Sequence, residues 1–500
     1  MAGFATTREA EVLLAEHRLL KQPAKESVSV LGLSNNSKET KPGDLFICKG
    51  FSFKKEYLEM AEQKGAFSAI GEQEIAGSRL PFILVTDIRK AMSLLAKAFY
   101  EEPSAHFCLV GITGTKGKTT TAYDLKAIFD AHVGRETGLL STVERFVGGL
   151  HEPSHLTTPE SLDLQQLFCV ANSHKLPYLT MEVSSQAYKL DRVYGQKFQY
   201  GLFLNFGEDH ICDHEHSDLE DYFSCKLQLM KNCETAVVCK ETDRLEEICS
   251  VASRWAKKVL LVGVEDETCD YSASQLQKEQ MGFSFLIHEK KSGLIWPCRL
   301  SQEGRFNVSN ALAAIAVARE EGISPETIQK ALENLQVPGR MNLIAGKDLH
   351  IFVDYAHNDL SFRALFDSIC QDYPEAKRIV VAGAPGERAH SRRKDIGSLC
   401  GKYADLAIFT ADDPGFEDPL IICKQMEAFA KEAGEAEVRI ETDRTKAVEM
   451  AVREAPAGSV VILAGKGHEV TQRVRGTYEP YESDAAVARR VLEETGRCGK

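Results

Sequence analysis

The sequence lacks the features that mark exported proteins, membrane proteins and nucleic-acid-binding proteins. No apolar run approaches the ~18–20 residues needed to cross a bilayer. The N-terminal MAGFATTREAEVLLAEHRLLKQ has no basic stretch before an apolar core, so it is not expected to be a signal peptide. No run of Lys or Arg could follow a nucleic-acid backbone, and the formal net charge is −13. These absences predict a cytoplasmic protein that binds no nucleic acid and does not insert into a membrane.

Paired cysteines, internal repeats and low-complexity segments are also missing. The 14 cysteines are scattered without a CxxC pair, which predicts free, mostly buried thiols in a reducing compartment. With 43% hydrophobic and 27% charged residues, the composition is that of a globular protein. A chain of 500 residues exceeds one ordinary core, so we expect about two to four domains, with three as the central expectation.

Alternating strand and helix patterns divide the chain into three regions. Residues 1–104 have the pattern of a small mixed α/β region. The apolar run 107–113 predicts a strand buried on both faces and opens a longer α/β region, 105–337, which VPGRM ends with a Pro-Gly break. A third α/β series fills 338–500. Further strands are expected at 178–183, 201–205, 235–239, 259–262, 351–353, 378–382, 406–410 and 460–464, and helices at 88–100, 310–321 and 325–335. This alternation implies mainly parallel sheets with sites at the carboxyl ends of the strands.

The strongest single signal is the segment GITGTKGKTTT, which directly follows the strand at 107–113 and precedes a helical pattern. Its glycines allow backbone N–H groups to surround a phosphate, and the helix N-terminus adds positive potential. Lys118 can reach terminal phosphates and Thr119 can bind Mg²⁺. The general nucleotide-binding pattern requires a glycine where Ile112 stands, so only the shorter Gly114-x-x-Gly117-Lys118-Thr119 loop fits. The alternative is a Gly-rich turn without function.

Around this short loop the sequence resembles the Mur ligase family, which joins carboxylates to amino acids with ATP. The resemblance covers nearly the whole chain and is strongest to the members that add a diamino acid to a UDP-linked muramyl dipeptide. It implies three domains: a small mixed α/β domain (1–104) for the UDP-sugar substrate, a central P-loop ATP-binding domain with a mainly parallel sheet (105–337), and a Rossmann-like domain (338–500) for the amino acid. It also implies ATP and Mg²⁺ as cofactors, and a monomer is expected. The implied ATP-binding loop residues are Gly114, Thr115, Lys116, Gly117, Lys118, Thr119 and Thr120.

Two segments after the loop carry residues that match substrate positions of the family. In LTTPE, Thr157 and Thr158 match a Thr-Thr-Pro that holds the sugar nucleotide, although threonines here could simply cap a helix. In EVSSQAYKLDRV, the resemblance assigns Ser184 and Arg192 to the same substrate. Near the N-terminus, Ser37 matches the family's uridine site, although Asn36 and Lys38 replace the usual flanking residues.

Three groups are candidates for metal binding. Glu182 ends an apolar strand opposite the phosphate loop, where a carboxylate is a natural Mg²⁺ ligand. The stretch NFGEDHICDHEHSDLEDYFSCK could hold structural zinc, but its ligands are crowded and no CxxC pair accompanies them. The resemblance instead implies that His210 binds a second Mg²⁺ and leaves His216 an ordinary loop residue. It further implies that Lys226 is carbamylated to N6-carboxylysine, an anionic oxygen ligand; the alternative is a surface lysine.

The resemblance assigns the remaining residues to ATP and the incoming amino acid. Those implied for ATP are Asn307, Asn310, Arg340, Asp354 and His357, and those implied for the amino acid are Arg388, Asp412, Asp413, Gly465 and Glu469. Family members that use meso-diaminopimelate carry an arginine at the position of Gly415. Without that arginine, and with acids nearby in Asp412, Asp413, Glu417, Asp418 and Glu469, the charge balance favours L-lysine. Ornithine and diaminopimelate stay open as alternatives.

The resemblance, together with this charge balance, implies an ATP-dependent amide ligase that adds L-lysine to UDP-N-acetylmuramoyl-L-alanyl-D-glutamate for peptidoglycan synthesis, through an acyl phosphate. Three alternatives are weighed against it. A folylpolyglutamate-synthetase-like ligase would share the loop but would not need the N-terminal region. A regulatory nucleotide switch would need a guanine-reading NKxD motif, which is absent. A purely binding protein would not need the full set of catalytic residues.

Overall fold

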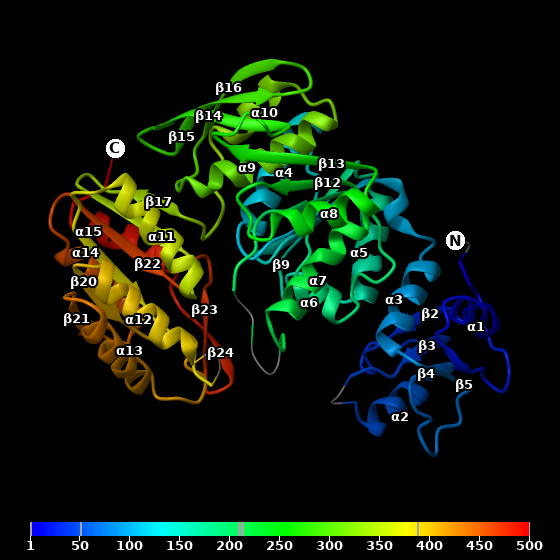
Figure 1. Cartoon of the computed structure of the whole chain (residues 1–500). Coiled ribbons are helices and arrows are strands. Elements are labelled where there is room, and N and C mark those ends of the chain that lie inside the picture. The colour runs from blue at the N-terminus through cyan, green and yellow to red at the C-terminus, as the bar shows by residue number, and fades with distance from the viewer. Residues whose placement is uncertain (1–2, 51–52, 209–210, 212–214, 388–389, 500) are drawn as a thin grey trace.

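The computed structural model describes residues 3–50, 53–208, 211, 215–387 and 390–499. Figure 1 shows three bodies in a row, with the central one between an N-terminal body in blue and a C-terminal body in yellow to red. Each body contains one main sheet, and each main sheet lies within one of the three regions expected from the sequence. The chain therefore has the predicted three-domain α/β fold, while the exact boundaries between domains stay a prediction.

The N-terminal domain is a five-stranded sheet in the order β1-β5-β4-β3-β2. Only β1 runs antiparallel to its neighbour. Its elements are α1 (Thr7–Glu16), β1 (Leu20–Gln22), β2 (Gly32–Ser34), β3 (Asp44–Ile47), α2 (Lys55–Gln63), β4 (Ser68–Gly71), β5 (Phe82–Val85) and α3 (Ile88–Phe99). The helix expected at 88–100 is confirmed, and the side chain of Asp87 caps it by accepting hydrogen bonds from two backbone N–H groups of its first turn.

The central domain is an eleven-stranded sheet in the order β16-β15-β14-β13-β12-β11-β6-β10-β7-β8-β9. The strands from β7 to β14 in that order pair in parallel, and an antiparallel hairpin extends each edge. Its strands are β6 (Cys108–Thr113), β7 (Gly138–Leu140), β8 (Glu144–Val147), β9 (Leu150–Pro153), β10 (Tyr178–Glu182), β11 (Phe198–Phe203), β12 (Cys233–Cys239), β13 (Lys258–Val264), β14 (Tyr271–Lys278), β15 (Phe283–Glu289) and β16 (Leu294–Leu300).

Helices cover both faces of the central sheet, which is why its parallel strands are nearly continuous apolar runs. The helical elements are η1 (Pro103–His106), α4 (Lys118–Val133), α5 (Ser161–Ser173), α6 (Ser185–Lys189), α7 (Leu219–Lys231), α8 (Leu245–Trp255), α9 (Phe306–Glu320) and α10 (Pro325–Leu332). One apolar core joins α4, α9 and α10 to the sheet, and a second core joins α5, α7 and α8 to its other face.

The C-terminal domain is a six-stranded sheet in the order β17-β18-β22-β19-β20-β21, in which only β17 is antiparallel. Its elements are β17 (Asn342–Ala345), β18 (Leu349–Asp354), α11 (Asp359–Asp372), β19 (Arg378–Ala382), α12 (Ser391–Tyr403), β20 (Leu406–Phe409), α13 (Pro419–Ala433), β21 (Glu437–Ile440), α14 (Arg444–Glu454), β22 (Ser459–Ala464), the hairpin β23 (Thr471–Val474) and β24 (Thr477–Pro480), and α15 (Asp484–Glu494). The helices α11, α12 and α13 pack on one face, and α14 and α15 pack on the other.

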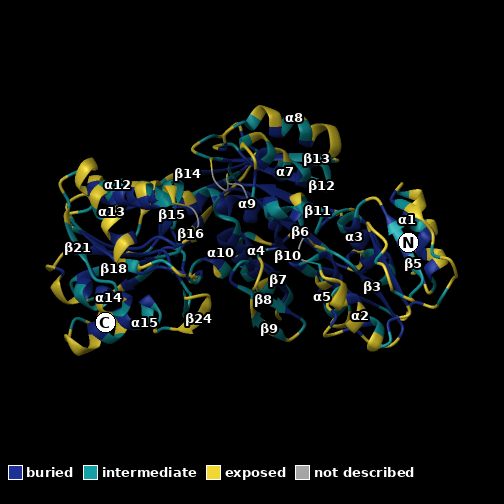
Figure 2. Ribbon diagram, turned by 90° about the horizontal axis from the view of Figure 1, so that it is seen from below, coloured by how far each residue is buried: buried dark blue, intermediate teal, exposed yellow. Residues whose placement is uncertain are grey.

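Figure 2 shows the strands of both large sheets buried, with exposed residues gathered on the outer helices. The strands and helices expected at 107–113, 178–183, 235–239, 325–335, 378–382 and 460–464 are confirmed within a few residues. Within the part of the chain that the structure describes, the cysteines are free thiols, all but Cys498 are at least partly buried, and no helix is long and apolar enough to cross a membrane.

Candidate active site

A cavity of about 830 Å³ lies between the central and C-terminal domains. It is lined from the central domain by the carboxyl ends of β6, β10 and β11 and by the start of α9, and from the C-terminal domain by the end of β18. Sixteen of the residues singled out from the sequence line it: Thr115, Lys116, Gly117, Lys118, Thr119, Thr120, Thr157, Glu182, Ser184, Arg192, Lys226, Asn307, Asn310, Arg340, Asp354 and His357. The sequence therefore located the residues of one continuous site in two domains.

The phosphate loop joins the end of β6 to the first turn of α4. Gly117 has a φ of +83°, and a Cβ there would lie 2.2 Å from Oδ1 of Asn310. Only glycine fits such a left-handed, crowded position. Asn310 in turn donates a hydrogen bond to Oδ1 of Asn307 (2.9 Å), whose own amide donates to the carbonyl of Glu303 (2.6 Å). The two asparagines proposed to contact adenine thus also support the loop from behind.

Two lysines converge on the carbonyl of Gly114. Lys118 Nζ donates to it at 2.7 Å and to the carbonyl of Thr115 at 3.1 Å, and Lys226 Nζ donates to the Gly114 carbonyl at 2.7 Å. Lys226 is buried, with its ammonium 4.6 Å from the ring centre of Tyr222. Both side chains therefore lie against the loop, and the ammonium of Lys118 gives it the positive potential that a polyphosphate needs, in an otherwise acidic protein.

Asn205 holds the loop in place and was not identified from the sequence. Its backbone carbonyl accepts from the N–H of Thr115 (3.0 Å), and its side chain both accepts from the N–H of Lys116 (2.8 Å) and donates to the carbonyl of the same residue (3.0 Å). The sequence did contain a signal for this role. Asn205 is the first polar residue after the apolar strand β11, at the carboxyl edge where sites of parallel sheets lie.

Glu182 is a buried carboxylate that faces the cavity. It accepts hydrogen bonds from the backbone N–H (2.8 Å) and the hydroxyl (3.1 Å) of Thr142, and among the described residues no Lys or Arg forms an ion pair with it. Burying an anion without a counter-ion is costly. A divalent cation would supply the missing charge, so the donor set of Glu182 and the hydroxyl of Thr119 fits Mg²⁺.

The residues expected to hold the sugar nucleotide divide into two groups. Thr157, Ser184 and Arg192 line the cavity, whereas Thr158 is fully buried and bonds within the protein: its hydroxyl donates to the carbonyl of Glu182 (2.9 Å) and accepts from the N–H of Ser184 (3.1 Å). Arg192 donates to the carbonyl of Thr158 at 3.2 Å. Ser37 is buried in the N-terminal domain, away from the cavity lining.

His216 is fully buried and bonded through both ring nitrogens, so it is not the ordinary loop residue expected from the sequence. Nε2 lies 2.9 Å from the hydroxyl of Ser185, and Nδ1 lies 2.9 Å from a carboxylate oxygen of Asp221. Ser185 begins α6, shortly after Glu182 ends β10, and Asp221 lies in α7, the helix that contains Lys226. His216 therefore connects the segment after Glu182 to α7. His216, Asp221 and Cys225 are also close enough together to hold a metal ion, but both nitrogens of the histidine already have protein partners. His210 lies outside the described residues.

On the C-terminal side, Arg340 reaches the phosphate loop. Its Nη2 donates to the hydroxyl of Thr119 at 3.1 Å, and its guanidinium lies 5.0 Å from the ring centre of Tyr355. The carboxylate of Asp354 accepts from the N–H groups of Met341 and Ala356, both at 2.7 Å, and burial raises its pKa. Nδ1 of His357 lies 2.7 Å from the carbonyl of Tyr355. These residues fix the segment around Arg340 against the central domain.

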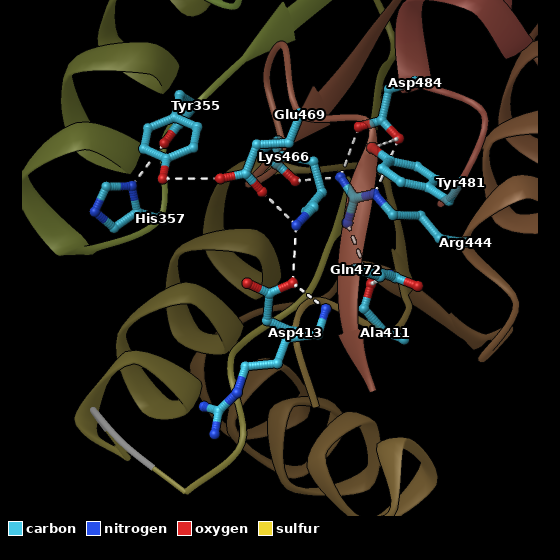
Figure 3. Close-up of polar contacts among 12 residues, drawn as sticks. Tyr355, His357, Ala411, Asp413, Arg444, Lys466, Glu469, Gln472, Tyr481 and Asp484 are labelled. Atoms are coloured by element: carbon cyan, nitrogen blue, oxygen red, sulfur yellow. Dashed lines mark hydrogen bonds and ion pairs between the residues drawn. The ribbon is translucent and has the colours of Figure 1, made fainter. Parts of the chain in front are cut away.

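Asp413 and Glu469, two of the residues expected to bind the amino acid, lie in a separate cluster, shown in Figure 3, outside the lining of the cavity. Asp413 lies 2.9 Å from Nζ of Lys466, which also pairs with Glu469. The carboxylate of Asp412 is buried, and burial raises its pKa while the nearby charges of Arg444 and Lys466 lower it. Arg388 lies outside the described residues.

Two acids expected in this pocket have structural partners instead. Glu417 pairs with Arg393 at 2.8 Å, and Asp418 accepts from the N–H of Leu420 (2.9 Å) as the N-cap of α13. The group of acids around Asp413 is therefore smaller than the sequence indicated. It consists of Asp412, Asp413 and Glu469, which together form the acidic recess. Gly465 lies beside it at the end of β22.

Comparison with known proteins identifies the family. The Mur ligase middle domain matches residues 112–318, and the Mur ligase, glutamate ligase domain matches residues 339–467. The chain belongs to the Mur ligase family. It is 37% identical to the UDP-N-acetylmuramyl-tripeptide synthetase of Lactobacillus acidophilus over 97% of this chain and 96% of that protein. It is also 37% identical to the UDP-N-acetylmuramoyl-L-alanyl-D-glutamate--L-lysine ligase of Enterococcus faecalis, over 93% of this chain and 92% of that one.

Solved Mur ligases have the same fold. A UDP-N-acetylmuramoyl-L-alanyl-D-glutamate--2,6-diaminopimelate ligase superposes with a TM-score of 0.67 at 22% identity, covering 94% of this chain and 96% of the other. MurF from Acinetobacter baumannii superposes with a TM-score of 0.64 at 20% identity, covering 99% of this chain and 100% of the other. The family resemblance and the α/β three-domain fold expected from the sequence are confirmed, and Mur ligases use ATP and Mg²⁺.

Proposed function

We propose that this Mur ligase adds L-lysine to UDP-N-acetylmuramoyl-L-alanyl-D-glutamate in peptidoglycan synthesis, acting in the cytoplasm as a monomer. The observation that carries the proposal is the convergence of Lys118 and Lys226 on the phosphate loop, opposite the buried carboxylate of Glu182, in a cavity between two domains. The names of the relatives from L. acidophilus and E. faecalis support the same activity. Because those relatives match 97% and 93% of the chain, a folylpolyglutamate-synthetase-like activity is disfavoured.

The reaction has two steps. First, a carboxylate oxygen of the UDP-linked dipeptide attacks the γ-phosphorus of ATP, the bond to the β-phosphate oxygen breaks, and ADP leaves an acyl phosphate behind. Then an amine nitrogen of lysine attacks the acyl carbon, the carbon–oxygen bond to phosphate breaks, and inorganic phosphate and a proton are released. The residues of this chain bring together two anions and an amine, so their work is positioning and charge neutralisation. Lys118 and Arg340 are proposed to neutralise the terminal phosphates.

Thr119 and Glu182 would hold Mg²⁺, with His210 as a further ligand, and the ion would offset negative charge on the phosphates. Lys226 is proposed to become N6-carboxylysine, because an anionic carbamate suits a site beside a divalent cation better than an ammonium does. Its amine is buried next to the loop, where the carbamate would be shielded from solvent.

The carbamate is tested with Lys226→Ala. We expect loss of most phosphate release, partial rescue by added formate or acetate, which supply an oxygen ligand, and no loss in Lys231→Ala on the same helix. Full activity of wild-type protein whose intact mass shows unmodified Lys226 would refute the carbamate.

Recognition of L-lysine is proposed to rest on the acidic recess of Asp412, Asp413 and Glu469, with the α-carboxylate bound by Arg388. Gly415 offers no arginine for a second carboxylate, so diaminopimelate is the disfavoured alternative; ornithine would place its ammonium about one methylene short. The activity itself is tested by phosphate release from ATP with the UDP-linked dipeptide and each of the three diamino acids. Turnover with lysine that Lys118→Ala abolishes supports the proposal, and turnover with none of the three refutes it.

A further inference from the structure

Lys466 lies beneath the acidic recess, where the sequence drew attention only to acids. Its side chain is 1% exposed, whereas the side chains of Asp413 and Glu469, with which it pairs, are 16% and 30% exposed. Asp413 follows β20 and Glu469 follows β22, so the ammonium bridges two separate loops at the carboxyl edge of the sheet (Figure 3). A tight turn sets the spacing from Lys466 to Glu469, because the N–H of Glu469 donates to the carbonyl of Lys466 at 2.9 Å.

Among the described residues, further groups lie near the recess. Arg444 is buried and pairs with Asp484 at 2.7 Å while also donating to the carbonyl of Ala464 at 2.8 Å. Tyr355 donates its hydroxyl to Glu469 at 3.2 Å, and the ring of Tyr481 lies 6.0 Å from the Lys466 ammonium. Asp412 adds a further buried negative charge, and Arg473 approaches Asp413 through its backbone N–H at 3.0 Å.

This geometry decides between two roles for the lysine. If Lys466 only filled the substrate site, its side chain would have to move away when the amino acid binds. The side chain is buried, at 1% exposure, so it stays in place. The two carboxylates are both more exposed than the ammonium, so a second cation would reach them from the side away from Lys466. Two neighbouring carboxylates repel each other, and a cation fixed beneath them removes that repulsion and sets their separation.

We propose that Lys466 is a positioning residue that holds Asp413 and Glu469 together so that they grip the terminal ammonium of the incoming diamino acid. This inference rests on the proposed function, and it adds to that function the residue that organises the specificity pocket. Each of the two carboxylates would then contact both ammonium groups, that of Lys466 and that of the substrate.

Lys466 has a second consequence, for the charge of the pocket. Burial raises the pKa of Glu469, and Lys466 is the largest influence in the opposite direction. Asp412 and Asp413 both act to raise it further. Without Lys466, Glu469 would take up a proton at a higher pH and lose its attraction for an ammonium. Loss of Lys466 should therefore change the pH dependence of the KM for lysine. Loss of a purely structural residue would leave that pH dependence unchanged.

The test compares Lys466→Met with Lys466→Arg, measuring kcat and the KM of each substrate across the neutral and mildly alkaline pH range. For Lys466→Met we expect the KM of L-lysine to rise at least about 10-fold with the acid limb of its pH profile moved upward. The KM values of ATP and of the UDP-linked dipeptide should stay within about twofold of wild type. Lys466→Arg, which keeps the positive charge, should restore most of the affinity for lysine. An unchanged KM for lysine, or a parallel rise of all three KM values, would overturn the proposal.

A charge-balanced variant covers the case in which Lys466→Met does not fold. Lys466→Met/Glu469→Gln removes the lysine together with one partner, and it should raise the KM of lysine by less than the product of the two single effects, because Lys466 acts partly through that carboxylate. Effects that multiply would show an independent role and refute the inference. Wild-type turnover separates the two hypotheses: its absence refutes the proposed function, whereas turnover with multiplying effects refutes only the role of Lys466.

Discussion

Arg340 donates a hydrogen bond to the hydroxyl of Thr119 at 3.1 Å, across the boundary between the central and C-terminal domains. Thr119 lies in the first turn of α4, directly after the phosphate loop, and Arg340 lies just before β17. The contact makes the nucleotide site depend on how the two domains are placed. It also explains why residues so distant in sequence line one cavity.

The first prediction concerns this contact. Lysine at position 340 keeps the charge but loses the planar fork of donors and the stacking on Tyr355. For Arg340→Lys we expect kcat/KM for ATP to fall about 10- to 100-fold, equivalent to about 1.4–2.7 kcal/mol, with little change in Tm. Arg299→Lys, on the exposed face of β16, is the matched control. Equal kinetics of both variants in an ADP-release assay would show that the contact is dispensable.

The second prediction concerns His216. Replacing it with alanine leaves the hydroxyl of Ser185 without its partner and separates the turn after β10 from α7. We expect a loss of about 1–3 kcal/mol in the free energy of unfolding, and a higher Mg²⁺ concentration for half-maximal activity because Glu182 and Lys226 lose their common support. His106→Ala, at an exposed site, should leave both quantities unchanged. A loss of stability with an unaltered Mg²⁺ requirement would limit His216 to a packing role.

The third prediction concerns stability and pH. Asp124 in α4 is fully buried, and burial raises its pKa to about 7. One oxygen accepts from the amide of Gln302, whereas its Oδ2 and the Oε1 of Gln302 have no hydrogen-bond partner. Burial disfavours the charged carboxylate, so the folded protein favours the protonated acid.

The direction in which stability changes with pH follows from that preference. A carboxyl whose pKa is raised by folding contributes fully to stability below its unfolded pKa, and the contribution is lost as the pH rises towards about 7. A rise of the pKa from 3.8 to about 7 corresponds to up to about 4 kcal/mol in the free energy of unfolding. Asp124→Asn keeps the amide-like pairing without the titration, so urea unfolding should show less difference between about pH 5 and about pH 8 than in wild type. An equal pH dependence in the two proteins would exclude Asp124 as its source.

Much of the fold could be predicted from the sequence, because two physical rules apply without reference to distant contacts. Strands buried on both faces must be continuous apolar runs, which located β6, β10, β12, β19 and β22. Sites of parallel sheets lie at carboxyl ends, which brought the phosphate loop, Glu182 and Asp354 together. The edge strands β7–β9, β14–β16 and β23–β24 were missed. β7–β9 and β23–β24 are only three or four residues long, and β14–β16 alternate buried and more exposed residues instead of forming continuous apolar runs.

The pairing of charges could not be predicted. In the sequence Asp413, Glu417 and Asp418 are neighbouring acids of equal standing. In the structure one pairs with Lys466, one with Arg393, and one caps a helix. Which partner each acid finds depends on contacts with residues far along the chain, and spacing carries no information about them. The same holds for His216, whose partners come from α6 and α7.

The last prediction concerns the choice of diamino acid. Gly415 has a φ of +61°, and a Cβ there would lie 2.3 Å from Oε2 of Glu387. Glu387 in turn approaches Arg473 at 3.5 Å. The space into which a side chain at position 415 would extend is therefore occupied by another carboxylate. Wild-type protein should prefer lysine over diaminopimelate by at least about 100-fold in kcat/KM, or about 2.7 kcal/mol.

Gly415→Arg alone should not reverse this preference. The left-handed backbone disfavours a side chain by about 1–2 kcal/mol, and the new guanidinium would pair with Glu387 rather than with the substrate. We expect it to lower activity with lysine without admitting diaminopimelate, whereas Gly415→Arg/Glu387→Ala frees the guanidinium and should use diaminopimelate measurably. Glu387→Ala alone is the control, and it should weaken discrimination without creating the new activity. If Gly415→Arg by itself used diaminopimelate as well as the double variant does, Glu387 would have no part in substrate choice, and the missing arginine alone would account for it.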